Sequence, residues 1–252
     1  GSPGMSGAAE LAATAALRGG AGYLRLSTPG GASPIMPIEA VGYPLNAESW
    51  ASEVVVQAER FQVVAVGPGL GRSEGTRVQV RELVSQLNRP LLLDGDALWA
   101  LGLQAGELLK QRRSSTIITP HDGEFEQLMG HRPGADRIAA ARELAAATGA
   151  VVVLKGQGTV VTQTGSGCLV VRSGDSRLAT AGTGDVLTGL IAAHVALGAD
   201  PLLAAASAAQ LHGRASMLGP ERGLLASDIA GSIAAAWNQC EAEQPPSRRS
   251  LT

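Results

Sequence analysis

Val151-Val152-Val153-Leu154, followed at once by Lys155-Gly156-Gln157-Gly158-Thr159, is the stretch that decides the fold class. Its apolar residues stand at consecutive positions, which is typical of a strand buried on both faces. The run Val63-Val64-Ala65-Val66 has the same pattern and leads into Gly67-Pro68-Gly69-Leu70-Gly71. Strands of this kind belong to parallel sheets that helices cover on both sides.

Outward from these two runs, apolar stretches of strand length alternate with helical patterns along the chain. This repetition predicts one α/β domain over residues 1–242, doubly wound in three layers, with a mainly parallel sheet, helices on both faces and no separate lid domain. Strands are expected over 23–27, 54–56, 63–66, 91–94, 116–119, 151–154, 160–162 and 168–171. Helices are expected over 8–18, 77–87, 98–102, 123–129, 136–148, 185–197, 201–218 and 226–241. The polar residues 243–252 are expected to form a disordered tail.

Composition excludes several classes of protein. Hydrophobic residues make up 45% of the chain and the formal net charge is −2, so we expect a globular protein that binds no nucleic acid. The longest apolar stretch, near residue 190, is interrupted by His194 and Gly198, which argues against a membrane span. Cys168 and Cys240 stand in unrelated sequence contexts, which fits a reducing cytoplasm.

Polar, glycine-rich loops follow four of the predicted strands. Ligands of open parallel sheets bind beyond the carboxyl ends of the strands, so these loops are expected to line one crevice. Neither a dinucleotide-binding fingerprint nor a P-loop sequence is present in them. The loops span residues 67–71, 94–96, 119–124 and 155–159.

Ala181-Gly182-Thr183-Gly184-Asp185 is the strongest candidate for a reactive site, because it opens a predicted helix. Its small residues leave backbone N–H groups open to an anion, and the helix adds the positive end of its dipole. Asp185 could be a plain helix cap, but a cap does not require the small residues before it. The pattern therefore predicts phosphoryl transfer to a hydroxyl group, with Asp185 as the base.

Two of the loops carry acidic or imidazole groups with alternative roles. Asp94 and Asp96 could hold Mg²⁺ or bind ligand hydroxyls, or Asp96 could cap the next helix. In the loop over 119–124, Asp122 or Gly123 could cap the following helix, which leaves His121 as a candidate ligand contact.

The loops over 67–71 and 155–159 each have two interpretations, one as a turn and one as part of a binding site. Gly67–Gly71 is either a tight turn or a place where a ligand approaches the backbone closely. Residues 155–159 form either a glycine hairpin or a nucleotide-binding loop in which Lys155 contacts a phosphate as a point charge.

Taken together, these motifs resemble a known family. Thr180–Asp185 is similar to the G-[AT]-G-D signature of ribokinase-like kinases, and the ordered set resembles one branch, the ADP/ATP-dependent NAD(P)H-hydrate dehydratases. His121 favours this branch, since vitamin kinases of the superfamily usually carry Asn after Thr-Pro. The family's first strand, which would precede Ala8, is not found in the sequence. The matching pieces are Gly1-Ser2 with Gly7-Ala8, 67–71, 94–98, 119–124, 154–159 and 179–189.

The resemblance implies a repair reaction in which a nucleotide, ADP or ATP, phosphorylates the ring hydroxyl of hydrated NADH or NADPH, and phosphate then leaves. It implies Mg²⁺ on the phosphates and Asp185 as the catalytic base. The implied anion hole is Ala181, Gly182, Thr183 and Gly184. The implied substrate-binding residues are Ala8, Gly69, His121 and Asp185. The implied nucleotide-binding residues are Lys155, Gly156, Gln157, Gly158, Thr159 and Gly184.

The resemblance also implies a cytoplasmic homo-oligomer, often a tetramer, that is fused to or works with an NAD(P)H-hydrate epimerase. One alternative is a small-alcohol kinase of the thiazole or pyridoxine type, which would release a phosphorylated alcohol. Another is a catalytically silent nucleotide-binding module, which would tend to lose Asp185.

Overall fold

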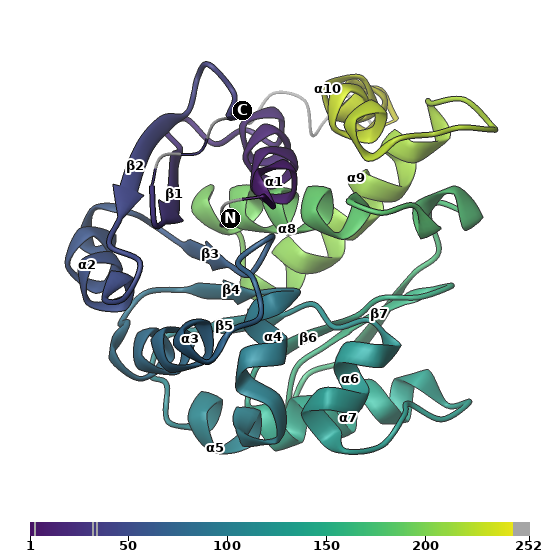
Figure 1. The fold of residues 1–252 in the computed structure, drawn as a ribbon. Coiled ribbons are helices and arrows are strands. Elements are labelled where there is room, and N and C mark those ends of the chain that lie inside the picture. Colours follow the sequence, from purple (N-terminus) through teal and green to yellow (C-terminus); the bar gives the residue numbers. More distant parts are fainter. Residues whose placement is uncertain (3, 32, 34, 244–252) are drawn as a thin grey trace.

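The computed structural model describes residues 1–2, 4–31, 33 and 35–243 (Figure 1). Of the predicted tail over 243–252, only Glu243 falls within this range, and the rest lies outside the described residues. Glu243 forms an ion pair with Arg214, at 2.8 Å between Oε2 and a guanidinium nitrogen.

A six-stranded sheet in the order β3-β4-β5-β6-β7-β8 forms the middle layer. β3 to β6 pair in parallel, β7 pairs antiparallel with β6, and β8 pairs antiparallel with β7, so the predicted mainly parallel sheet is confirmed. The strands are β3 (Val64–Val66), β4 (Leu91–Leu93), β5 (Thr116–Ile118), β6 (Val151–Leu154), β7 (Thr159–Thr162) and β8 (Cys168–Val171).

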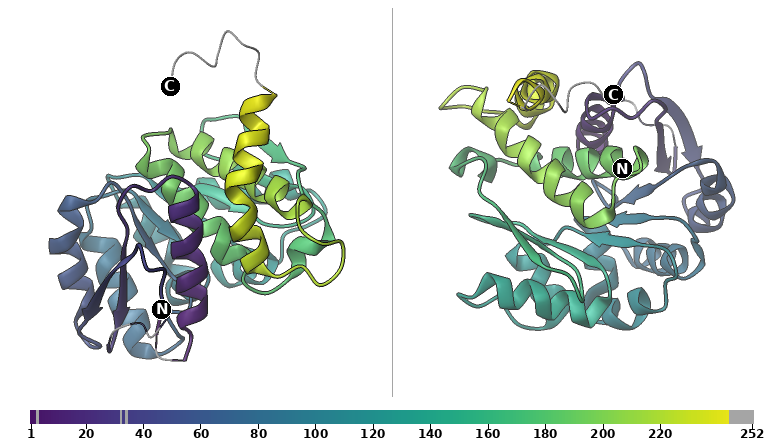
Figure 2. Two further views of the ribbon diagram at one scale, coloured as in Figure 1. Left: turned by 90° about the horizontal axis from the view of Figure 1, so that it is seen from above. Right: turned by 180° about the vertical axis from the view of Figure 1, so that it is seen from behind.

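Helices cover both faces of this sheet, as Figure 1 and the two further views in Figure 2 show. One face carries α1 (Ser6–Arg18), α8 (Thr183–Ala196), α9 (Pro201–Met217) and α10 (Ala226–Ala242). The other carries α2 (Trp50–Gln57), α3 (Glu74–Gln86), α4 (Asp96–Leu101), α5 (Ala105–Lys110), α6 (Asp122–Met129) and α7 (Arg137–Thr148). Short 3₁₀ turns lie at Ala58–Arg60, Gly102–Gln104 and Ser176–Ala179.

Alternating side chains of each central strand divide the apolar core into two parts. Leu91 and Leu93 pack among the helices α2–α7, while Leu92 packs toward α8–α10. In β6, Val152 and Leu154 face the first cluster, and Val151 and Val153 face the second. Because successive side chains of a strand point to opposite faces, only consecutive apolar residues can fill both clusters.

One predicted strand is wrong. Residues 54–56 lie in helix α2, although three successive valines have high strand propensity. Trp50 and Ala51 are buried, and Val54 and Val55, one turn later, pack against the same core, while Val56 is 71% exposed. This burial repeats with the period of a helix, so packing outweighs the local preference of the valines.

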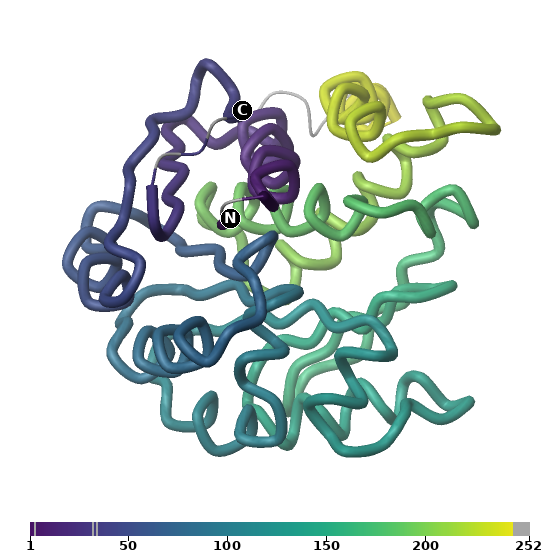
Figure 3. The backbone as a smooth tube through the Cα atoms, in the orientation of Figure 1, coloured from purple at the N-terminus to yellow at the C-terminus, as the bar shows by residue number. Residues whose placement is uncertain are grey.

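A separate pair of parallel strands, β1 (Arg25–Pro29) and β2 (Val41–Leu45), lies beside the main sheet. The predicted strand over 23–27 belongs to this pair, and β2 was not predicted. The trace in Figure 3 follows the chain from α1 through β1 and β2 before it enters the sheet at β3.

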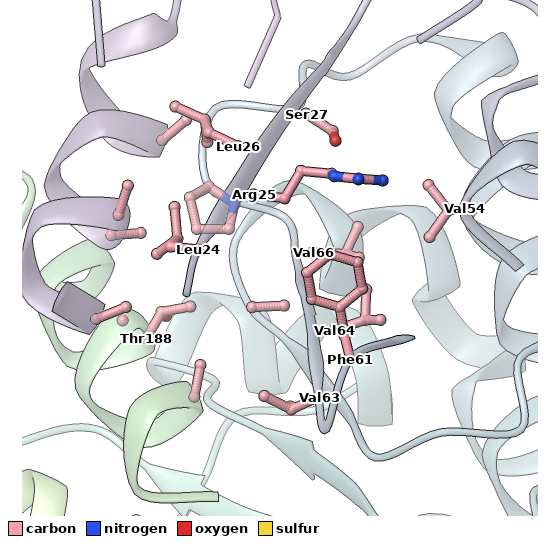
Figure 4. Close-up of a pocket in the computed structure, with 18 of the residues that line it drawn as sticks. Leu24, Arg25, Leu26, Ser27, Val54, Phe61, Val63, Val64, Val66 and Thr188 are labelled. Atoms are coloured by element: carbon pink, nitrogen blue, oxygen red, sulfur yellow. The ribbon is translucent and has the colours of Figure 1, made fainter. Parts of the chain in front are cut away.

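Between this pair and the sheet lies an apolar cavity of about 250 Å³ (Figure 4). The outer edge of β3 forms one wall, through Val63, Val64 and Val66. Alanines of α1 and α8 and the apolar side chains Leu24 and Leu26 form the others. Within the described residues, β3 pairs with β4 alone.

Candidate functional site

Four loops meet at one edge of the sheet, as the sequence predicts. They follow β3, β4, β5 and β6, which are parallel neighbours, so their carboxyl ends point the same way. The loop after β4 reaches back to β3, because the backbone N–H of Asp94 donates to the carbonyl of Val66 at 3.1 Å.

Glycines after β3 allow two close approaches of backbone to backbone. Gly67 has a φ of +131°, and a Cβ there would overlap the carbonyl oxygen of Asp94. Gly69 has a φ of +59°, and a Cβ there would overlap the carbonyl oxygen of Met5, just before α1. These glycines therefore bring the start of α1 and the loop after β4 against the end of β3.

Helix α8 begins above this edge without a side chain that caps it. Its N-cap is Gly182, at a φ of +89°, and no side-chain hydrogen bond satisfies the first N–H groups. The hydroxyl of Thr183 turns away from them and donates to the carbonyl of Leu178 at 2.7 Å. The N–H of Thr183 donates to the carbonyl of Thr180, at a long 3.4 Å, and the N–H groups of a helix start that lack a partner are suited to an anion.

Asp185 is the third residue of α8 and not its N-cap, so the plain cap interpretation is excluded. It borders a cleft together with Ala8, Gly69 and Asp96. Burial and the negative charge of Asp94 raise the pKa of Asp185 to about 7, while the Lys155 ammonium opposes the rise. Asp185 therefore changes its charge near neutral pH, which a general base requires.

Beneath the start of α8 lies a buried cluster of charges. The Lys155 ammonium contacts the carboxylate of Asp94 at 2.7 Å and that of Glu124 at 3.5 Å. Burial alone would lower the pKa of Lys155, but the two carboxylates outweigh it and raise the pKa above the ordinary value. A Cβ on Gly184 would stand 3.4 Å from the Lys155 nitrogen, so the cluster adjoins the backbone of the loop.

Lys155 opens a hairpin between β6 and β7, and Gly158 turns it with a φ of +78°. The guanidinium of Arg137 donates to the carbonyl of Lys155 at 2.8 Å, and a Cβ on Gly156 would collide with it. The glycine hairpin is therefore present, and its lysine is already paired with two carboxylates. Its role toward a nucleotide is a proposal.

His121 caps helix α6, which corrects the expectation that Asp122 or Gly123 does so. Its Nδ1 accepts from the backbone N–H of Gly123 at 3.0 Å and of Glu124 at 3.2 Å. Glu124 accepts from the backbone N–H of His121 in return, at 2.8 Å. The other ring nitrogen, Nε2, lies 3.4 Å from the Glu124 carboxylate, and 57% of the His121 side chain is exposed, so a ligand could contact the ring.

Asp96 does not cap α4, whose N-cap is Gly95. One oxygen of the Asp96 carboxylate instead accepts from the backbone N–H of Gly71 at 2.8 Å, and the other pairs with Arg72 at 2.8 Å. Asp96 therefore holds the loop after β3 in place.

Sequence reasoning missed three buried partners of this site. Thr119 and Thr188 donate their hydroxyls to Asp94, at 2.6 and 3.0 Å. His212 on α9 is 6% exposed, and its Nε2 has no hydrogen-bond partner. The position of Thr188, four residues after Gly184 and so on one helix face with it, is a signal that could have pointed to it. No signal marks His212.

Two features are absent from the described residues. These residues contain no group of three or more His, Cys, Asp or Glu side chains that could hold a metal ion. None of the helices in the described part of the chain is both long and apolar enough to span a bilayer.

Comparison with known proteins supports one family. The profile of the NAD(P)H-hydrate dehydratases matches residues 1–235. A bifunctional NAD(P)H-hydrate repair enzyme of Salinibacter ruber is 38% identical over 228 residues, which are 86% of this chain and 42% of that protein. The chain therefore spans less than half the length of this relative.

Solved structures agree with the fold. An ADP/ATP-dependent NAD(P)H-hydrate dehydratase from Bacillus subtilis, co-crystallised with ATP and Mg²⁺, superposes with a TM-score of 0.83 at 31% identity, over 95% of this chain and 87% of the other. A ribokinase-like superfamily protein from Enterococcus faecalis has a TM-score of 0.77 at 21% identity, over 95% and 84%. The second likeness concerns the fold alone and supports a ribokinase-like architecture.

Proposed function

The chain belongs to the NAD(P)H-hydrate dehydratase family, and from this membership we propose that it converts hydrated NADH or NADPH back to the reduced cofactor, driven by ADP or ATP. The position of Asp185 is the observation that carries the proposal. Its carboxyl group, with a pKa of about 7, borders the cleft at the uncapped start of α8. A base and an anion site thus stand side by side, as phosphoryl transfer to a hydroxyl requires.

In the first step, the Asp185 carboxylate takes the proton of the ring hydroxyl. The hydroxyl oxygen bonds to the terminal phosphorus of the nucleotide, while the bond from that phosphorus to the bridging oxygen breaks. The backbone N–H groups of 181–184 stabilise the charge on the phosphoryl group in transit. They are fixed before the reaction, so little reorganisation is needed.

In the second step, the phosphate leaves with the electron pair of the ring C–O bond. A proton is lost from the neighbouring ring carbon, and the double bond of the dihydropyridine returns. Hydroxide is a poor leaving group and phosphate a good one, which explains why a nucleotide drives the loss of water.

Binding of the two substrates is divided between the cleft and the hairpin. We assign the hydrated dinucleotide to Ala8, Gly69, His121 and Asp185, three of which border the cleft. We assign the adenine nucleotide to residues 155–159 and Gly184. The short separation of Gly184 from Lys155 supports this second assignment, because it lets one phosphate chain reach both.

Mg²⁺ accompanies ATP in the crystals of the Bacillus subtilis relative, and we propose that it accompanies the nucleotide here. The described side chains do not form a metal cage of their own. Mg²⁺ binds substrate phosphates and water readily, so it fits a site completed by the nucleotide.

We further propose a cytoplasmic homo-oligomer that works with an NAD(P)H-hydrate epimerase, whether fused or separate. The unpaired state of Cys168 and Cys240 agrees with a reducing compartment. Analytical ultracentrifugation tests the oligomer, and expression of the full-length gene product tests the fusion.

The test of the activity is incubation of the protein with hydrated NADH or hydrated NADPH, Mg²⁺, and ADP or ATP in turn. We expect the absorbance of reduced nicotinamide to return, together with one free phosphate per turnover. Phosphorylation of a thiazole alcohol or of pyridoxine in a parallel incubation, without return of the absorbance, would instead indicate a small-alcohol kinase. Nucleotide binding without either product would indicate a silent module, and both outcomes contradict the proposal.

A further inference from the structure

The carboxylate of Asp94 lies at the end of β4, directly under the start of α8, and only 3% of the residue is exposed. One oxygen accepts from Lys155 at 2.7 Å and from the hydroxyl of Thr119 at 2.6 Å. The other accepts from the hydroxyl of Thr188 at 3.0 Å. All three donors are buried or nearly so, and Asp94 is not among the residues that border the cleft.

These contacts join four elements of the fold. Asp94 follows β4, Thr119 follows β5, Lys155 follows β6, and Thr188 lies in α8. Thr188 is one turn beyond Gly184, so its bond to Asp94 fixes the second turn of α8, and with it the start of the helix, to the sheet edge. A buried polar network of this kind determines position as long as every member is satisfied.

The same cluster sets the charge that Asp185 experiences. Asp94 from β4, Asp96 from α4 and Glu124 from α6 are negative, and Lys155 from the end of β6 is positive. The amino group of Gly1, before α1, is a further charge that interacts with Asp185. One ammonium shared between two carboxylates leaves an excess of negative charge beneath α8.

We propose that Asp94 is a positioning residue for the phosphoryl transfer: it fixes the start of α8 and the Lys155 ammonium, and it places a negative charge directly beneath the backbone of Gly184. The inference rests on the proposed function only in naming Asp185 as the base. Asp94 does not touch the cleft, so it acts through Asp185 and Lys155.

The test is a ¹³C NMR titration of the Asp185 carboxyl carbon in the wild type and in Asp94→Asn. Removing the negative charge should lower the titration midpoint of Asp185 by about one pH unit. The matched control is Thr188→Val, which removes a hydrogen bond to Asp94 and no charge, and should leave the midpoint within about 0.3 units.

A midpoint that stays in place or rises in Asp94→Asn would overturn the proposal, and so would an equal shift in Thr188→Val. If Asp94→Asn does not fold, Asp94→Ser provides the second test, because it also removes the negative charge and should lower the midpoint. An unchanged or higher midpoint in that variant would be equally decisive against the proposal.

A second measurement links the cluster to turnover. In Asp94→Asn the acidic limb of kcat/KM should move to lower pH together with the NMR midpoint. A purely structural role would lower activity at all pH values without moving the limb, which would contradict the proposal. If the protein has no dehydratase activity, the titration still gives its result, so the two proposals fail separately.

Discussion

At the scale of single residues, Asp185 combines two properties that a substitution can separate. Asp185→Asn keeps the shape and removes the base, so we expect the turnover rate to fall roughly 10²–10⁴-fold. The same substitution should not lower the stability of the fold at alkaline pH, although it lowers the turnover. The fold raises the pKa of this carboxyl to about 7, so the stability it contributes is full below about pH 4 and is lost as the pH rises through 7.

The matching measurement is a pair of assays at pH 8, for turnover and for thermal unfolding. The Asn variant should be nearly inactive there, and its Tm should equal or exceed that of the wild type. Near-normal turnover would remove Asp185 as the base, and a lower Tm would contradict the raised pKa.

Gly184 offers a graded test of the anion site. In Gly184→Ala the new Cβ would stand 3.4 Å from the Lys155 nitrogen and 3.9 Å from the Asp94 carboxylate, which are ordinary contacts. The further methyl groups of Gly184→Val have no such room and would obstruct the N–H groups of the loop. We expect calorimetry to show nucleotide binding for Ala and none for Val. Equal affinity of both variants would count against this loop as the phosphate site.

How far the sequence predicts the site also depends on single residues. The small residues before Asp185 predict an open helix start, because the requirement is local. The pairing of Lys155 with Asp94 and Glu124 could not be predicted, since 61 residues separate the first two in the chain. The cap formed by His121 was missed because His is an uncommon cap, although Glu124 three residues later fits a capping box.

At the scale of elements, α1 and α8 pack with their backbones in direct contact. A Cβ on Gly189 of α8 would overlap the carbonyl oxygen of Ala12 in α1. We therefore expect Gly189→Ala to cost roughly 1–3 kcal/mol of unfolding free energy, and about 2–4 °C of Tm per kcal/mol. Differential scanning calorimetry measures both.

Gly231→Ala is the matched control, since Gly231 lies in helix α10 with nothing within 4 Å of a new Cβ. There the change should raise stability by up to about 1 kcal/mol, through helix propensity alone. Similar effects at the two glycines would mean that α1 and α8 are not in contact as described.

The sequence predicts both fully buried strands and partly exposed ones: β8 was predicted over 168–171 although its centre is exposed, and β3, expected to be buried on both faces, has an exposed Ala65. β4 and β6 show unbroken apolar runs because the two core clusters demand them. β2 was missed, because Val41-Gly42-Tyr43-Pro44-Leu45 contains glycine and proline and is mostly exposed. The valines of α2 were predicted as a strand. Only the tertiary structure shows that the buried residues of this segment repeat with the period of a helix.

At the scale of the whole molecule, a buried imidazole limits stability in acid. Burial lowers the pKa of His212 to about 4, from an ordinary value of 6.5. The His212 imidazole binds a proton more readily in the unfolded chain than in the folded one. Its contribution to the free energy of unfolding is therefore full above pH 6.5 and is lost as the pH falls to about 4. A shift of this size corresponds to about 3 kcal/mol.

We expect His212→Gln to flatten the loss of stability between pH 6.5 and 4, as measured by urea unfolding at successive pH values. The comparison is made with the wild type at each pH, because Asp185 titrates in an overlapping range with the opposite sign. If the stability of the variant falls between pH 6.5 and 4 as steeply as that of the wild type, His212 is not the cause of the loss of stability in acid.

The outer edge of β3 has a consequence for handling the protein in solution. Across the described chain no strand pairs with this side of β3, and Ala65 at its centre is exposed. Unpaired peptide groups next to apolar walls are a template on which a second molecule can add its own strand. We therefore expect concentrated solutions of the protein to aggregate first through this edge of β3. The substitution Ala65→Lys would place a charge on the edge and should slow the aggregation.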